Sequence, residues 1–175
     1  MKIAAAVAVL LLAACSKAGN GSAGNAAAGS ADSAPTTASV GQQAPSWSEP
    51  LVGGGGTLSM SALRGKPLFI DFFATWCPPC NAEAPEVNAA YRKYASRGFQ
   101  VVGVDVLENA AKAKLFVDEH KLTYPAVVDS GVLRDAYNIN GMPVGVFIDR
   151  TGVVRKIEIG QLSPAAIDAD IKAIL

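Results

Sequence analysis

The stretch from Pro67 to Cys80 constrains the fold more than any other part of the chain, because a dense apolar run passes directly into two cysteines separated by two prolines. The run "PLFIDFFAT" has too few polar residues for a half-exposed strand, so it predicts a central strand covered on both faces. A helix is expected from Pro78 to about Ser96, since proline is favourable in the first helical turn and Gly98 is a typical end signal. The sequence therefore places two thiols where a buried strand passes into a helix.

The remainder of the chain alternates between strand and helix patterns. Upstream, "SWSEPL", four glycines and "TLSM" predict a hairpin. Downstream, "FQVVGVDV" predicts a second buried strand, "NAAKAKLFVDEHKL" a helix with Asn109 as its N-cap, and "PAVVD" a short extended piece. The tail "VGVFIDRTGVVRKIEIG" predicts two strands joined by a turn, before a last helix that begins at Ser163-Pro164. This order predicts an α/β fold, a mixed sheet with helices on both faces.

The N-terminus has the pattern of an export signal followed by a tether. Residues 1–14 combine a positive charge with an apolar run too short to span a bilayer, which is typical of a signal peptide. The end of this run resembles the lipobox of bacterial lipoproteins and predicts that Cys15 is lipidated; an incidental cysteine is the alternative. Residues 15–39 lack aromatic and large aliphatic side chains and predict a flexible tether, which leaves 40–175 as the folded domain.

Charge and cysteine content limit the possible functions. The chain has 15 basic and 15 acidic residues, so it lacks the basic excess typical of nucleic-acid binding. With Cys15 lipidated, the folded part keeps two cysteines and the single histidine, His120, which do not complete a four-ligand zinc site. We expect no metal site and interpret His120 as a surface helix residue, although a mixed site with carboxylates or one shared between chains remains open.

The spacing of Cys77 and Cys80 allows them to form and break a disulfide. Residues three positions apart on a helix lie on neighbouring positions of one face, within disulfide reach. Cys77 would face the free amides of the helix N-terminus, which lower a thiol pKa, whereas Cys80 would be less exposed and closer to a normal thiol. This asymmetry predicts that Cys77 attacks a partner disulfide and that Cys80 resolves the mixed disulfide. The motif alone also fits a metal site or a structural staple.

The segment "FIDFFATWCPPCNAEAP" resembles the active-site segment of the thioredoxin superfamily. The wider pattern "GQQAPSW…LRGKPLFIDFFATWCPPC…VVGVDV…YNINGMPVGVFIDRTGVV" is similar to membrane-tethered thiol-disulfide oxidoreductases of the TlpA/ResA/DsbE type, from about Val40 to the C-terminus. The resemblance implies a thioredoxin fold, that is, a mixed central sheet flanked by helices, with an N-terminal β-hairpin and an inserted element after the second core strand.

The resemblance also assigns roles around the dithiol. It implies that Cys77 is the nucleophile and Cys80 the resolving cysteine. Met142-Pro143 matches the loop whose cis-proline lies against the dithiol, where the backbone before the proline pairs with an extended partner. We expect Trp76 to pack beside the dithiol without taking part in chemistry. The expected substrate-binding surface therefore consists of Trp76, Pro78, Pro79, Met142 and Pro143.

Three carboxylates are candidates for tuning the dithiol. Asp71 lies in an otherwise apolar strand and matches the buried aspartate that exchanges a proton with the resolving thiol in thioredoxins, whereas many TlpA/ResA relatives carry asparagine there. The alternative is a carboxylate that is solvated or paired with a lysine such as Lys66. Glu83 matches an acidic residue that tunes the dithiol in ResA-like proteins, or is an ordinary helix-surface glutamate. Glu108 matches a family glutamate after the second core strand.

The leading functional hypothesis is an extracytoplasmic disulfide reductase with no cofactor beyond its Cys77–Cys80 pair. The resemblance implies protein disulfides as substrates, such as those of apocytochrome c or copper-protein precursors, and regeneration by a membrane electron donor. The domain would face the periplasm or the cell exterior, held to the membrane by its lipid anchor. The alternatives are a copper metallochaperone-like binding module and a dithiol oxidase; a peroxidase of the peroxiredoxin type fits the cysteine spacing less well.

Overall fold

The computed structural model describes residues 37–175. The predicted signal peptide, the lipidation site Cys15 and most of the predicted tether lie outside the described residues. The Ala38 N–H donates to the carbonyl of Ala136 at 2.7 Å, and the Ala38 side chain packs against the core. Within the described residues, contacts with the core therefore already occur just before the predicted domain boundary at Val40. No helix within 37–175 is both long enough and apolar enough to cross a membrane.

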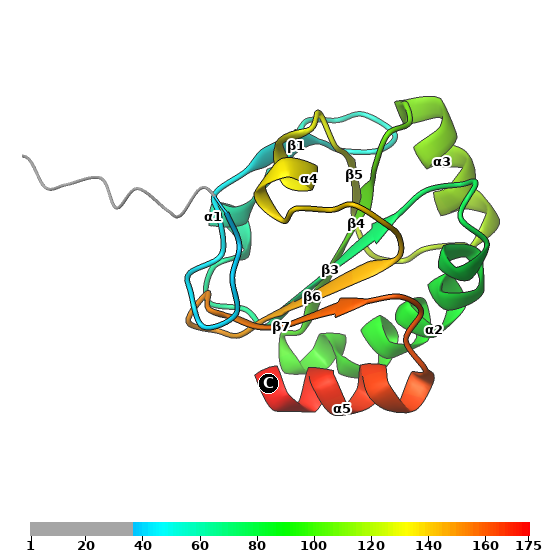
Figure 1. Ribbon diagram of the computed structural model, residues 1–175. Helices are drawn as coiled ribbons and strands as arrows, with labels where there is room; N and C mark the ends of the chain where they lie inside the picture. Colours follow the sequence, from blue (N-terminus) through cyan, green and yellow to red (C-terminus); the bar gives the residue numbers. More distant parts are fainter. Residues whose placement is uncertain (1–36) are drawn as a thin grey trace, which may run out of the picture. The chain divides into compact units, whose positions relative to one another are not determined.

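A five-stranded mixed sheet forms the centre of the domain, as predicted (Figure 1). The strand order is β5-β4-β3-β6-β7, with β3 parallel to β4 and antiparallel to β6. Every residue of β3 is buried, which confirms that "PLFIDFFAT" contains the central strand. The strands are β3 (Leu68–Phe73), β4 (Gln100–Asp105), β5 (Ala126–Val128), β6 (Val144–Ile148) and β7 (Val154–Ile159).

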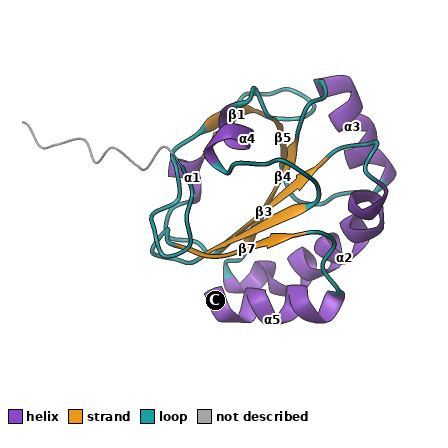
Figure 2. Ribbon diagram, viewed as in Figure 1, coloured by secondary structure: helices purple, strands orange, loops and turns teal. Residues whose placement is uncertain are grey.

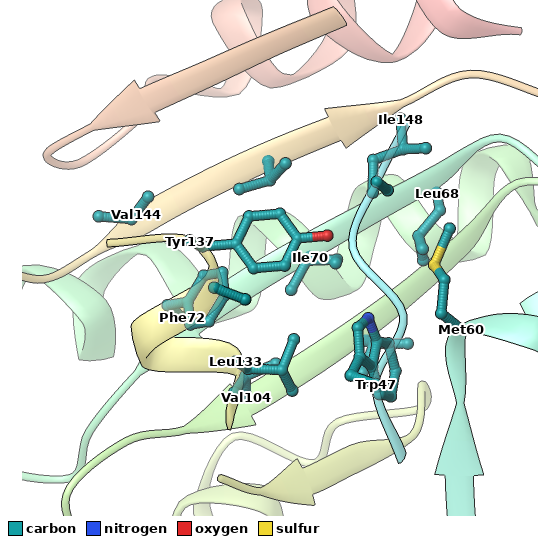
Figure 3. Packing of buried hydrophobic residues seen from close by; sticks show 14 of the residues in the cluster. Trp47, Met60, Leu68, Ile70, Phe72, Val104, Leu133, Tyr137, Val144 and Ile148 are labelled. Carbon is teal, nitrogen blue, oxygen red and sulfur yellow. The ribbon is translucent and has the colours of Figure 1, made fainter. Parts of the chain in front are cut away.

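Two helical layers cover the sheet (Figure 2). The helices are α1 (Met60–Leu63), α2 (Pro78–Tyr94), α3 (Ala110–Glu119), α4 (Val132–Ala136) and α5 (Pro164–Ile174). Because strand residues alternate between faces, Ile70 and Phe72 point into one core cluster with Leu133 of α4 (Figure 3). Phe69 points to the opposite face, into a cluster with Ile171 of α5. Asp71 lies on this second face, which α2 and α5 cover.

The hairpin and the caps follow the sequence expectations. Strands β1 (Ser48–Pro50) and β2 (Thr57–Ser59) pair antiparallel around the four glycines. The side chain of Asn109 accepts the N–H groups of Ala111 and Lys112 and so caps α3, and α3 with β5 occupies the place of the implied inserted element. The predictions missed α1 and α4, because helices of four and five residues are too short to give a periodic pattern.

Candidate functional site

The two cysteines lie at the start of α2. Cys77 is the N-cap, and its Sγ accepts the N–H of Cys80 at 3.2 Å. The two residues are joined by a disulfide with their Cα atoms 5.3 Å apart. Both are only 3% exposed, so the expected difference in exposure is wrong for this form, since the bonded sulfurs share one apolar pocket with Phe73 and Phe116.

Two prolines limit the number of amides near the nucleophile. Pro78 and Pro79 occupy the first positions of α2, and neither has an N–H. Of the first three helical residues, Cys80 is therefore the only one whose N–H can reach the Cys77 sulfur. A thiolate at this helix start receives fewer hydrogen bonds than it would with other residues between the cysteines.

Asp71 has a glycine beside it on each of the two adjacent strands, and neither glycine has a side chain to fill the space next to the carboxyl group. Its neighbours on the adjacent strands are Gly103 and Gly145. A Cβ atom at Gly103 would lie 2.9 Å from the ring of Phe73, and one at Gly145 would lie 2.6 Å from the ring of Phe69. The two aromatic rings therefore cover the glycines and surround the carboxyl group with apolar atoms.

Burial governs the protonation of Asp71. The residue is 4% exposed, and its Oδ2 accepts a long hydrogen bond of 3.4 Å from the hydroxyl of Tyr124. Burial, with a smaller contribution from the neighbouring negative charge of Glu83, raises the pKa of Asp71 to about 8, against a weaker opposing effect of Tyr124. The alternative in which Asp71 is solvated or paired with Lys66 is wrong. The sequence did not point to Tyr124, which lies in a loop with no motif of its own.

Glu83 is buried below Cys80 on the same helix. It is 3% exposed, and its Oε2 accepts the N–H of Leu162 at 2.9 Å. Burial raises the pKa of Glu83, while the bond from Leu162 acts in the opposite direction. The alternative of an ordinary surface glutamate is wrong. Asp71 and Glu83 are therefore two buried carboxyl groups with raised pKa values, and the charge of Glu83 contributes to the shift of Asp71.

A second carboxyl pair lies at the end of β4. Both oxygens of Glu108 accept hydrogen bonds from Thr75, one from its N–H and one from its hydroxyl, each at 2.6 Å. Asp105 is fully buried and its oxygens accept no hydrogen bond from a protein N–H or O–H. Burial first, and then Glu108, raise the pKa of Asp105 to about 8. The sequence analysis missed Asp105, although its place in the apolar strand "VVGVDV" is the same signal that singled out Asp71.

Three of the expected substrate-binding residues are placed near the disulfide: Pro78 and Pro79 lie between the cysteines, and Met142 packs against the cluster that contains both of them. The Met142-Pro143 peptide bond is cis, which confirms that prediction. Trp76 is 60% exposed, so much of its side chain is open to solvent, and its packing beside the dithiol stays a prediction. It lines, with Met142, a groove of about 650 Å³ whose other walls include Leu107, Arg134, Asn138 and Asn140. Two of its lining residues connect it to the cysteines: Trp76 precedes Cys77 in the chain, and Met142 packs against the apolar cluster that contains both cysteines.

His120 is not a free surface residue, which corrects the interpretation from the sequence. It is the C-cap of α3, half-buried, with its Nε2 2.9 Å from Oδ1 of Asn81. Asn81 follows Cys80 directly, and the sequence gave no reason to single it out. Within 37–175, no three or more His, Cys, Asp or Glu side chains are grouped so that they could hold a metal ion.

Comparisons with known proteins agree with this geometry. Residues 40–157 match the AhpC/TSA family. The thiol-disulfide oxidoreductase ResA of Halalkalibacterium halodurans is 30% identical over 121 residues, 69% of each chain, and that of Geobacillus kaustophilus is 33% identical over 116 residues, 66% of this chain and 67% of the relative. A thioredoxin-family thiol:disulfide interchange protein from Chlorobium tepidum superposes with a TM-score of 0.72 at 34% identity, covering 78% of this chain and 97% of its own. The predicted thioredoxin fold is thereby confirmed.

The raised carboxyl pKa values predict how stability changes with pH. A folded-state pKa near 8 against an unfolded value near 4 means that the folded protein binds more protons between these pH values, so its stability falls as pH rises through this range. The Asp71→Asn variant has no carboxyl group at this position, so it does not lose this stability. In urea unfolding of the oxidised protein, we expect the free energy of unfolding of the variant, relative to wild type, to rise by about 1–3 kcal/mol from pH 5 to pH 8. We expect the same change for Asp105→Asn, because the pKa of Asp105 is also raised to about 8.

The matched control for this measurement is Asp118→Asn, which changes an exposed carboxylate paired with Lys114. Its stability relative to wild type should be the same at both pH values, because an exposed ion pair contributes little. A constant difference between Asp71→Asn and wild type at pH 5 and pH 8 would contradict the assignment of a raised pKa.

Proposed function

This chain belongs to the AhpC/TSA family and is a thiol-disulfide oxidoreductase of the ResA/DsbE type, and from that premise we propose that it reduces disulfides of proteins outside the cytoplasm. The observation that carries the proposal is the Cys77–Cys80 disulfide at the start of α2, directly after Trp76, which lines the groove. Related enzymes named as thiol-disulfide oxidoreductases match 69% and 66% of this chain. Cys77 and Cys80 are the catalytic residues in this proposal.

The reaction proceeds in two exchanges. The Cys77 thiolate attacks one sulfur of the substrate disulfide, the substrate S–S bond breaks, and the released substrate thiolate takes a proton from solvent. Cys80 then loses its proton and attacks the Cys77 sulfur of the mixed disulfide, which releases the second substrate sulfur as a thiolate that takes a proton from solvent. Two electrons pass to the substrate, and the enzyme ends with the Cys77–Cys80 disulfide.

Asp71 is the proton acceptor for Cys80 in this scheme. Its pKa of about 8 lies close to the ordinary value of a cysteine thiol, about 8.5, so a proton can pass between the two groups with little free-energy change. Glu83 lies one helical turn after Cys80, and its charge helps to hold the Asp71 pKa in this range. A carboxyl with an ordinary pKa would be a much weaker base for a thiol.

The helix start supports reduction over oxidation. Strong dithiol oxidants stabilise the thiolate of their reduced form, which makes that form a poor electron donor. Here Pro78 and Pro79 supply no N–H to Cys77, and no histidine stands between the cysteines. The reduced form of this protein is therefore a better electron donor than the reduced form of a strong dithiol oxidant. A membrane electron donor would regenerate the reduced form after each turnover.

We assign substrate binding to the groove and the cis-proline loop. Trp76 and Met142 line the groove, Pro78 and Pro79 lie between the cysteines, and Pro143 follows the backbone that an extended substrate would pair with. Apocytochrome c or a copper-protein precursor, each with a cysteine pair to be kept reduced, is the substrate that the resemblance supports.

A Cys80→Ala variant expressed in the native host tests the exchange. Without the resolving thiol, the mixed disulfide between Cys77 and a substrate protein should accumulate and appear as a reducible adduct on a non-reducing gel. The Cys77→Ala/Cys80→Ala double variant is the control and should form no adduct. Adducts of equal amount in both variants, or none in either, would contradict disulfide exchange through Cys77.

The N-terminal segment supports a lipid anchor. We propose that residues 1–14 are removed as a signal peptide, that Cys15 is lipidated, and that 15–39 tether the domain 40–175 to a membrane outside the cytoplasm. Mass spectrometry of the N-terminal peptide from the native host should find Cys15 as the first residue, carrying a diacylglyceryl group. An unmodified Cys15 inside a peptide that keeps Ala14 would contradict the anchor.

A further inference from the structure

The side chain of Asn81 holds the backbone on both sides of Trp76. Its Nδ2 donates to the carbonyl of Thr75 at 3.0 Å and to the carbonyl of Cys77 at 2.8 Å. Glu108 holds Thr75 from its N–H and hydroxyl, so this residue is bonded from two directions. The nucleophile thus sits on a loop whose polar backbone groups are fixed by side chains from α2 and from the end of β4.

The orientation of the Asn81 amide determines the role of His120. Both hydrogens of an asparagine amide lie on nitrogen, and both are used here on carbonyl oxygens that can only accept. The amide oxygen therefore faces Nε2 of His120, at 2.9 Å, and can only accept from it. It follows that the Nε2 of His120 carries a hydrogen and donates to Asn81.

His120 is itself held in place by the core. Its backbone N–H donates to the carbonyl of Phe116 at 3.0 Å, and its ring lies 4.4 Å from the ring of Phe116. Phe116 in turn stacks on Phe73, the last residue of β3, with ring centroids 4.1 Å apart. The imidazole is therefore held in one position. Through Phe116 it packs against Phe73, at the end of the strand that leads into the active-site loop.

We propose that His120 is a positioning residue of the thiol-disulfide exchange, acting through Asn81 on the backbone of Cys77. The proposal rests on the proposed function, because it concerns how fast the same cysteine attacks. Without the bond from His120, the Asn81 amide keeps only the two hydrogen bonds of its Nδ2, so the donor that the carbonyls of Thr75 and Cys77 share is held less firmly. A nucleophile displaced by a fraction of an ångström to an ångström attacks more slowly, since exchange requires the three sulfurs to lie nearly in line.

The test is the second-order rate constant with which the pre-reduced protein reduces insulin disulfides. His120→Phe keeps the ring against Phe116 and removes the donor, and we expect a rate constant about 5–10-fold lower with the urea midpoint little changed. His120→Gln places an amide donor at similar reach and should restore the rate to within about twofold of wild type. Equal rates for His120→Phe and wild type, or no rescue by His120→Gln, would overturn the proposal.

Glu119→Gln, at the neighbouring exposed position of α3, is the matched control and should react as wild type does. The tautomer provides a second readout that needs no variant: nitrogen-15 NMR of the neutral imidazole should find the hydrogen on Nε2, and a hydrogen on Nδ1 alone would overturn the relay. If the wild-type protein does not reduce insulin, the result counts against the proposed function. If the wild type is active and His120→Phe has the same rate constant, the result counts only against the positioning role of His120.

Discussion

The hydrogen bonds at the start of α2 decide what the two cysteines can do. A helix N-terminus normally offers several free N–H groups, which would stabilise a thiolate strongly. In this protein Pro78 and Pro79 remove the first of them, and the Cys77 sulfur accepts the N–H of Cys80. The positive end of the helix still favours a thiolate, but less than it would with unblocked amides. The proposed role of the pair as an electron donor depends on this limited stabilisation.

Four carboxyl groups of the domain lie in two pairs. Asp71 and Glu83 lie on the face of the sheet that α2 covers, and Asp105 and Glu108 lie at the end of β4, where Glu108 also holds the active-site loop through Thr75. Uncompensated carboxylates are costly inside a protein, so Asp71 and Asp105 favour a bound proton near neutral pH. In the proposed function, Asp71 exchanges this proton with the resolving thiol.

The main elements of the fold could be predicted from the sequence because the apolar strands, the caps at Asn109 and Ser163 and the turn glycines are local signals. The cysteines and Asp71 could also be found, since a carboxylate in an apolar strand stands out. The glycine neighbours of Asp71 and the partners Tyr124 and Asn81 could not, because they depend on strand register and on long-range contacts. His120 was misjudged for the same reason: the bond to Asn81 joins residues far apart in the chain.

The redox equilibrium of the isolated domain with glutathione tests the central claim most directly, namely that the start of α2 makes the dithiol a reductant. The fraction of Cys77–Cys80 disulfide can be followed in buffers of defined ratio of reduced to oxidised glutathione. We expect a reduction potential near that of thioredoxin, about −270 mV. A value near that of strongly oxidising periplasmic enzymes, about −120 mV, would contradict it and would identify the protein as a dithiol oxidase.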